Sequence, residues 1–170
     1  MAPPGAIGEA SGPLAQLAPV AESAQGSPAA EAPALGALED QLFELVNADR
    51  LVAGLAPLAY DQALQQVARA RAAAQVPLAQ LSHFEPSGRP GYVVLVEELR
   101  LAYALVGENL ARLPGPEETV AERAEEGLRR SPTHRENTLD PVYDRLAVGA
   151  ATASDGRFVF AVIFGSAAHG

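Results

Sequence analysis

The last quarter of the chain carries the feature that most constrains its fold. Two β-prone runs, RLAVGAATA (residues 145–153) and RFVFAVIFG (residues 157–165), stand on either side of Ser154-Asp155-Gly156. Asp-Gly between such runs is a strong hairpin signal, because glycine adopts the positive φ that a tight turn requires. The second run is almost entirely apolar, so we expect it to form a central strand that is covered on both faces.

Helical patterns precede this hairpin. In LEDQLFELVNADRLVAG, apolar residues recur at helical spacing as far as Gly54, which is a natural C-terminal stop. The residues of this apolar face are Leu38, Leu42, Leu45, Val46 and Leu51. Asp61 can cap a second helix over residues 61–75. The inward stripe of that helix includes Leu64, Val67, Ala68 and Ala72.

The middle of the chain is more broken. Residues 82–91 (SHFEPSGRPG) hold two prolines and two glycines and are predicted to be a loop. Residues 93–106 predict a short helix that leads into GENL, and residues 117–130 predict a charged amphipathic helix. Helices first and a hairpin last indicate an α+β domain, with helices packed on an antiparallel sheet.

The start of the chain has a different character. Residues 1–36 are rich in Pro, Ala, Gly and Ser and show no periodicity, so we expect a disordered tether. A loosely packed arm on the domain is the alternative. Residues 37–170 are then the single folded domain that a chain of 170 residues can form.

Composition excludes several classes of function. A formal net charge of −9 argues against non-specific binding to nucleic acid and against docking on anionic membranes. Without cysteine, the chain has neither disulfides nor thiolate chemistry. No apolar run approaches the ~20 residues of an integral membrane segment. The opening MAPPGAIGEASGPL has no basic or continuous apolar region of a signal peptide, so we expect either a cytoplasmic protein or a mature form whose leader is not visible.

Three polar stretches are predicted to lie in loops or at the ends of elements: Ser82-His83, Gly107-Glu108-Asn109 and residues 131–137. Two imidazoles, from His83 and His134, and the carboxylate of Glu108 could hold a divalent metal, with zinc as the first candidate. Without metal, the same trio could act in acid–base chemistry. The simpler alternatives are capping or surface histidines, an acid that complements a helix dipole, and asparagines that satisfy turns.

A longer series of motifs resembles a known family. LFELVNADR, GLAPLAYDQALQQVA, SHF, GENL, SPTHRENTL and FVFAVIFG follow one another between residues 38 and 165. In this order they resemble the bacterial branch of the CAP superfamily, which includes cysteine-rich secretory proteins, venom antigen 5 allergens and plant pathogenesis-related proteins. The resemblance identifies residues 37–170 as a CAP (SCP) domain.

The resemblance implies a three-layer α-β-α sandwich with a small antiparallel sheet between helices. It also implies a cavity lined by two histidines and two acids, which binds a divalent metal in some members. His83, Glu108 and His134 match the metal-binding positions, and the second acid is replaced by Ser131, as is common in the bacterial branch. A site with one carboxylate should bind a metal only modestly.

Further residues extend this expected cavity. Asn109, Ser131 and Arg135 are candidate lining residues, and Arg135 could pair with Glu108 or with the carboxylate of a ligand. Its alternative is a surface arginine packed on its helix. Glu125 or Glu126 could substitute for the missing acid, although a solvated helix face is the simpler interpretation.

Three functions are compatible with these observations. The first is a secreted or cell-envelope domain, expected to be a monomer, that binds a small ligand, lipid or partner protein and requires no cofactor. The second is a metal-assisted hydrolase, most plausibly a protease, with Glu108 as base and His83 and His134 holding zinc. The third is a structural or stress-related envelope protein whose polar cluster only stabilises the fold.

Overall fold

The computed structural model describes residues 31–168, in which five helices and four strands follow the order α1-β1-α2-α3-β2-α4-α5-β3-β4. The helices are α1 (Glu31–Val52), α2 (Gln62–Gln75), α3 (Gly91–Glu98), α4 (Glu117–Arg130) and α5 (Pro132–Leu139). The strands are β1 (Ala59–Tyr60), β2 (Tyr103–Pro114), β3 (Arg145–Thr152) and β4 (Arg157–Ala167).

The predicted hairpin is confirmed and forms the centre of the sheet. The strand order is β1-β3-β4-β2, in which β3, β4 and β2 are antiparallel and the two-residue β1 runs parallel to β3. At the hairpin turn Gly156 has φ 80°, and Asp155 Oδ1 accepts a hydrogen bond from Arg157 N at 3.1 Å. The buried strand β4 lies between β3 and β2, as its apolar sequence predicts.

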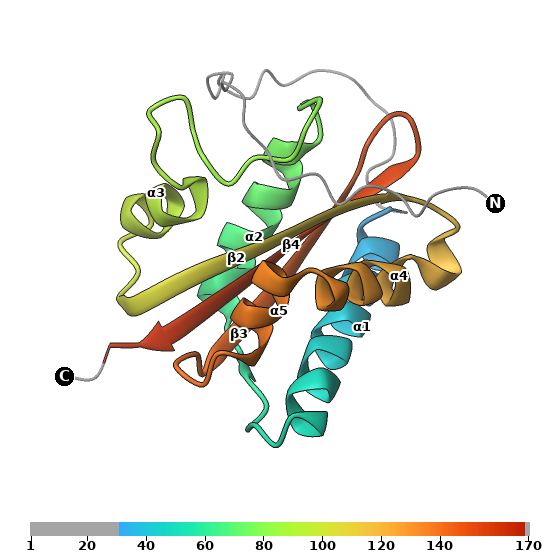
Figure 1. Cartoon of the computed structure of the whole chain (residues 1–170). Coiled ribbons are helices and arrows are strands. Elements are labelled where there is room, and N and C mark those ends of the chain that lie inside the picture. Colours follow the sequence, from blue (N-terminus) through green and yellow to red (C-terminus); the bar gives the residue numbers. More distant parts are fainter. Residues whose placement is uncertain (1–30, 169–170) are drawn as a thin grey trace.

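Alternate residues of β4 face two different layers, because successive side chains of a strand point to opposite faces. Phe160, Val162 and Phe164 belong to a core shared with α1 and α4. Val159, Ala161 and Ile163 pack with residues of α2 on the other face. Figure 1 shows α4 and α5 crossing one face of the sheet, with α2 behind it. The expected three-layer α-β-α sandwich is therefore present.

Helix α1 begins at Glu31, six residues before the boundary expected at residue 37. Residues 1–30, the larger part of the expected tether, lie outside the described residues. Leu38, Leu42 and Val46 are buried as predicted, because they lie on one face of α1. Leu51 is exposed, so the apolar face of the helix ends earlier than its sequence pattern suggests.

Helix α2 packs closely against the sheet. Its predicted cap is confirmed, since Asp61 Oδ1 accepts from Ala63 N at 2.8 Å and from Leu64 N at 3.0 Å. Gly149 of β3 makes the close approach possible, because a Cβ at this position would collide with the backbone of Ala68. The helix is thus held at a fixed depth on the sheet.

The helix predicted over residues 93–106 is wrong in its second half. Helix α3 ends at Glu98, Arg100 adopts a left-handed φ of 54°, and β2 begins at Tyr103. The GENL stretch therefore lies within a strand and not in a loop or in the first turn of a helix. Within residues 31–168, no helix is both long and apolar enough to cross a bilayer.

Candidate functional site

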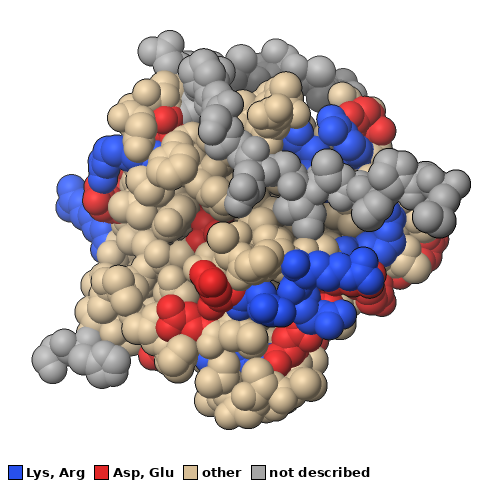
Figure 2. Space-filling model, viewed as in Figure 1, with Lys and Arg blue, Asp and Glu red and all other residues tan. Residues whose placement is uncertain are grey.

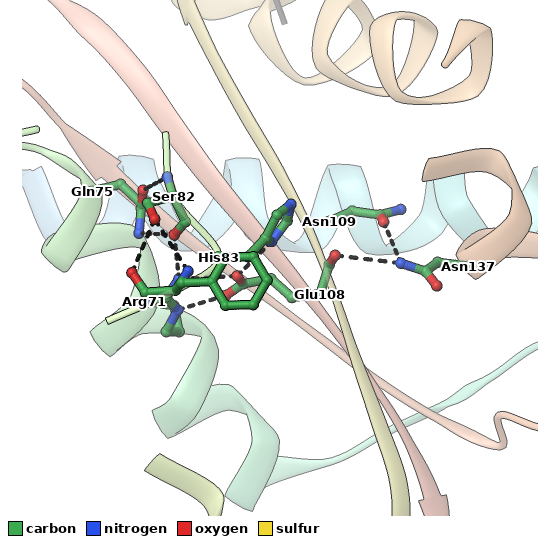
Figure 3. Close-up of polar contacts among 8 residues, drawn as sticks. Arg71, Gln75, Ser82, His83, Glu108, Asn109 and Asn137 are labelled. Carbon is green, nitrogen blue, oxygen red and sulfur yellow. Dashed lines mark hydrogen bonds and ion pairs between the residues drawn. The ribbon is translucent and has the colours of Figure 1, made fainter. Parts of the chain in front are cut away.

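Glu108 and Asn109 are neighbours in β2, and their side chains point to opposite faces of the sheet. Glu108 is paired across the sheet with Ile163, which packs against α2. Asn109 is paired with Val162, which belongs to the core on the other face. Cross-strand partners share a face, so Glu108 points toward α2 and Asn109 toward α5. Figure 3 shows the two groups of side chains on either side of the strand.

Arg71 of α2 is the direct partner of Glu108. Arg71 Nε lies 2.6 Å from Glu108 Oε2, and Arg71 Nη2 lies 3.0 Å from Oε1. The side chains of Arg71 and Glu108 are 3% and 0% exposed. A bidentate pair of this kind matches the planar fork of arginine to both oxygens of a carboxylate. The sequence interpretation missed Arg71, although Arg71 lies on the inward stripe of its helix.

Gln75, one turn after Arg71, fixes the loop that carries His83. Gln75 Nε2 donates to Ser82 O at 3.0 Å, and Ser82 N donates to Gln75 Oε1 at 2.8 Å. Arg71 Nη2 donates to the same Ser82 carbonyl at 2.7 Å. Helix α2 therefore holds both the acid and the backbone next to the first histidine (Figure 3).

His83 lies in a loop, as predicted, and its Nδ1 is 2.9 Å from Glu108 Oε1. A carboxylate in an ion pair can only accept, so His83 Nδ1–H is the donor. In a neutral ring, this tautomer has Nε2 as the acceptor, on a side chain that is 31% exposed. The phenol of Tyr92 lies within range of the same acid. Burial first, and then the charge of Glu108, raise the pKa of Tyr92.

The second predicted histidine comes close to the first. The ring centroids of His83 and His134 are 6.4 Å apart, and the ring planes are inclined by 52°. His134 is buried, and it belongs to a short helix rather than to the polar turn that its sequence suggests. Pro132 stands in the first turn of α5, where the missing backbone N–H costs little.

The side chain of Asn109 hydrogen-bonds to α5 and so holds this helix on the sheet. Its Nδ2 donates to His134 O at 2.9 Å, and its Oδ1 accepts from Asn137 Nδ2 at 2.9 Å. Asn137 Nδ2 also lies 3.4 Å from Glu108 O. The predicted lining residue Asn109 thus acts on the backbone of α5, which positions His134.

The contacts of Ser131 and Arg135 involve residues other than His83 and Glu108. Ser131 precedes α5, and its Oγ is 3.4 Å from Thr133 Oγ1. Arg135 is exposed and lines a surface pocket of about 230 Å³ together with Asp49 and Arg129. The suggested Arg135–Glu108 pair is therefore wrong, because Arg71 holds both oxygens of Glu108.

Glu125 and Glu126 do not replace the second acid. Glu126 pairs with Arg130 on the helix surface at 2.5 Å. Glu125 hydrogen-bonds Asp49, and Arg129 Nε lies 3.3 Å from its Oε1. Burial first, and then the hydrogen bond and the charge of Asp49, raise the pKa of Glu125 to about 8.

The residues of the site do not fit the metal that was expected. Across residues 31–168, no group of three or more histidine, cysteine or acidic side chains is arranged to hold a metal ion. Both oxygens of Glu108 are bound to Arg71, and His83 directs Nδ1–H at one of them. A cation at Glu108 would have to displace a guanidinium, which carries the same sign of charge.

Charge on the visible surface is mixed. Figure 2 shows a group of basic side chains over α4 and α5, with acidic side chains directly beside it. Arg129 and Arg130 both stand one turn after an acid, Glu125 and Glu126.

Comparison with known proteins points to one family. The family model described as the cysteine-rich secretory protein family (CAP) matches residues 43–164. YkwD of Bacillus subtilis is 32% identical over 117 residues, which are 68% of this chain and 43% of YkwD. The chain thus spans less than half of the length of this relative.

Two solved structures have a similar fold. An outer surface protein of Borrelia burgdorferi has a TM-score of 0.66 and 20% identity, over 76% of this chain and 92% of that one. An extracellular protein of Bacillus anthracis that contains an SCP domain has a TM-score of 0.67 and 24% identity, over 83% of this chain and 45% of that one.

Proposed function

The chain belongs to the cysteine-rich secretory protein (CAP) family, and we propose that it is an extracytoplasmic binding domain. Its ligand would rest on the surface formed by His83 and His134, here called the two-histidine surface. The ligand would be a small molecule, a lipid or a segment of a partner protein. Residues 37–170 would be the binding domain.

The observation that carries this proposal is the orientation of His83. Its Nδ1 is engaged by Glu108, so Nε2 is the ring nitrogen left to meet a ligand beside the ring of His134. Glu108 itself is neutralised by Arg71. A site with a fixed imidazole acceptor and no net negative charge suits a ligand that donates hydrogen bonds.

The location is supported by similar proteins. Both similar solved structures come from proteins that are described as outer surface or extracellular. The acidic net charge of −9 agrees with a protein that does not dock on anionic membranes through electrostatics. We therefore propose that this domain is secreted or lies at the cell envelope.

A purely structural role for the cluster is the second candidate. Arg71, Gln75 and Ser82 form a buried network that joins α2, the His83 loop and β2. Such networks can rigidify a core without contacting any ligand. A metal-assisted protease has less support, because Glu108 would be its base and has no oxygen free of Arg71.

The test follows the ring signals of His83 and His134 by NMR during titration with defined probes. Suitable probes are chitotriose, a lysophospholipid below its micellar concentration and an unstructured peptide. We expect one probe to shift both signals, and His83→Ala to weaken its binding at least about tenfold. Casein should not be cleaved, with or without added zinc.

Two other outcomes would replace this proposal. Casein hydrolysis that disappears in His134→Ala would make the domain a hydrolase. Ring signals that respond to no probe, together with strong destabilisation of both histidine variants, would favour the structural role.

A further inference from the structure

The buried acid of this site is neutralised from within the chain. We propose that Arg71 takes the place of a metal ion, so that the His83–Glu108 pair is a permanently metal-independent site. The inference concerns the charge of the site and holds whatever ligand the two-histidine surface binds.

Donors from the protein itself already occupy both oxygens of Glu108. Three donors reach its two oxygens: Arg71 Nε at 2.6 Å, Arg71 Nη2 at 3.0 Å and His83 Nδ1 at 2.9 Å. Zinc requires lone pairs from its ligands, and His83 presents an N–H to this carboxylate, so Nδ1 and Oε1 cannot both ligate one ion in this arrangement. The side chain of Glu108 is fully buried, so its charge must be compensated, and the guanidinium does so.

The surrounding backbone is shaped around the guanidinium. Arg71 Nη2 donates to Ser82 O at 2.7 Å, which satisfies a third polar contact of the same side chain. The first residue of α3 is Gly91, and a Cβ at this position would collide with Arg71 Nη1. Gly91 N also donates to His83 O at 2.8 Å, so the loop and α3 close over the arginine together. The structure therefore provides a fitted site for the guanidinium, beyond the ion pair alone.

The chain offers a matched control on the same helix. Arg69 lies two residues before Arg71 and also pairs with an acid, Glu39, at 2.6 Å. The side chain of Arg69 is 60% exposed, whereas that of Arg71 is 3% exposed. Removing Arg69 changes net charge by the same amount and takes the arginine from Glu39, whose side chain is 6% exposed, but it leaves Glu108 compensated.

The experiment compares zinc binding by the wild type, Arg71→Met, Arg69→Met and the double variant Arg71→Met/Glu108→Gln. Isothermal titration with ZnCl₂ and thermal unfolding are the readouts. We expect no saturable heat and no shift in Tm for the wild type and Arg69→Met. In Arg71→Met the freed carboxylate, His83 and His134 should bind zinc and raise Tm by about 5 °C or more. The double variant should not respond, because no buried charge is left to compensate.

Stoichiometric zinc binding by the wild type that is lost in His83→Ala would overturn the proposal. A folded Arg71→Met that ignores zinc would also overturn it, since arginine would then not stand in for the ion. If Arg71→Met does not fold even with zinc, the wild-type titration still tests the proposal, because saturable zinc binding by the wild type would contradict it. Failure of ligand binding at the two-histidine surface is measured with other probes and would not alter the zinc result.

Discussion

Glu108 and Glu125 are both acids turned away from solvent, on opposite sides of the sheet, and they meet their arginines differently. Glu108 is 0% exposed and receives two nitrogens of Arg71, at 2.6 and 3.0 Å. Glu125 is 12% exposed, lies 3.3 Å from one nitrogen of Arg129, and hydrogen-bonds a second acid, Asp49. Arg129 also lies 4.0 Å from Asp49, so one cation is shared between two carboxyl groups.

The difference lies in how the charge of each carboxyl group is compensated by its neighbours. At Glu108 the fork of one guanidinium compensates one acid, and His83 adds a third donor. At Glu125 the nearest neighbours include a like charge, and the pKa rises to about 8 because of burial and Asp49. Both acids have an arginine nearby. They differ in the number and direction of the donors that reach their oxygens.

Removing Arg71 should produce the largest effect. Arg71→Met leaves Glu108 buried and uncompensated, so in metal-free buffer the free energy of unfolding should fall by about 3–5 kcal/mol. Urea unfolding followed by circular dichroism measures this loss. Adding Glu108→Gln should recover part of it, because no buried charge remains. A loss below about 1 kcal/mol for Arg71→Met would contradict the assigned role of this pair.

The second effect depends on pH and comes from Glu125. The pKa of Glu125 is raised from 4.5 to about 8, so the folded state keeps a proton that the unfolded chain releases. Stability should therefore fall as pH rises from about 4.5 toward 8, by about 1 kcal/mol once solvent screening is allowed for. Glu125→Gln should flatten this dependence, measured as Tm against pH.

Glu126→Gln provides the control for that series. Glu126 is the next residue of α4, and it pairs with Arg130 on the exposed surface. Its loss should leave the slope of stability against pH unchanged between pH 4.5 and 8. An identical slope in Glu125→Gln and the wild type would show that the Asp49–Glu125 contact does not hold a proton.

The smallest effect is expected at a fully solvated pair. Arg89 and Glu97 are 2.6 Å apart, with side chains 50% and 57% exposed. Glu97→Gln should therefore leave the unfolding midpoint within experimental error, because water screens the interaction. A clear shift in the urea midpoint would contradict the view that burial decides how much Glu108, Glu125 and Glu97 each affect stability.

Much of the fold could be predicted from local patterns. The apolar run of β4 with its Asp-Gly turn, and the spacing of Leu38, Leu42 and Val46 in α1, each depend on neighbouring residues alone. The strand over Tyr103–Pro114 could not be predicted in this way. Its first residues have the pattern of a continuing helix, and pairing with β4, more than forty residues later, decides its conformation.

The sequence predicted that His83, Glu108 and His134 come close together, but it did not predict the arginine that balances the charge of Glu108. SHF, GENL and SPTHR identify His83, Glu108 and His134 because they resemble family motifs. Arg71 has no such motif, and its signal is a charged residue at an inward position next to Ala72. An arginine on a buried stripe requires a partner, which points to an acid elsewhere in the fold.

The most direct test of this account is the ring tautomer of His83, read from the ¹⁵N chemical shifts of its two nitrogens at neutral pH. If Glu108 is held by Arg71 and accepts from His83, Nδ1 carries the proton and Nε2 is bare. This tautomer should be lost in Glu108→Leu, which has no acceptor. A proton on Nε2 in the wild type, with Nδ1 bare, would contradict the geometry on which both the binding surface and the metal-independent site depend.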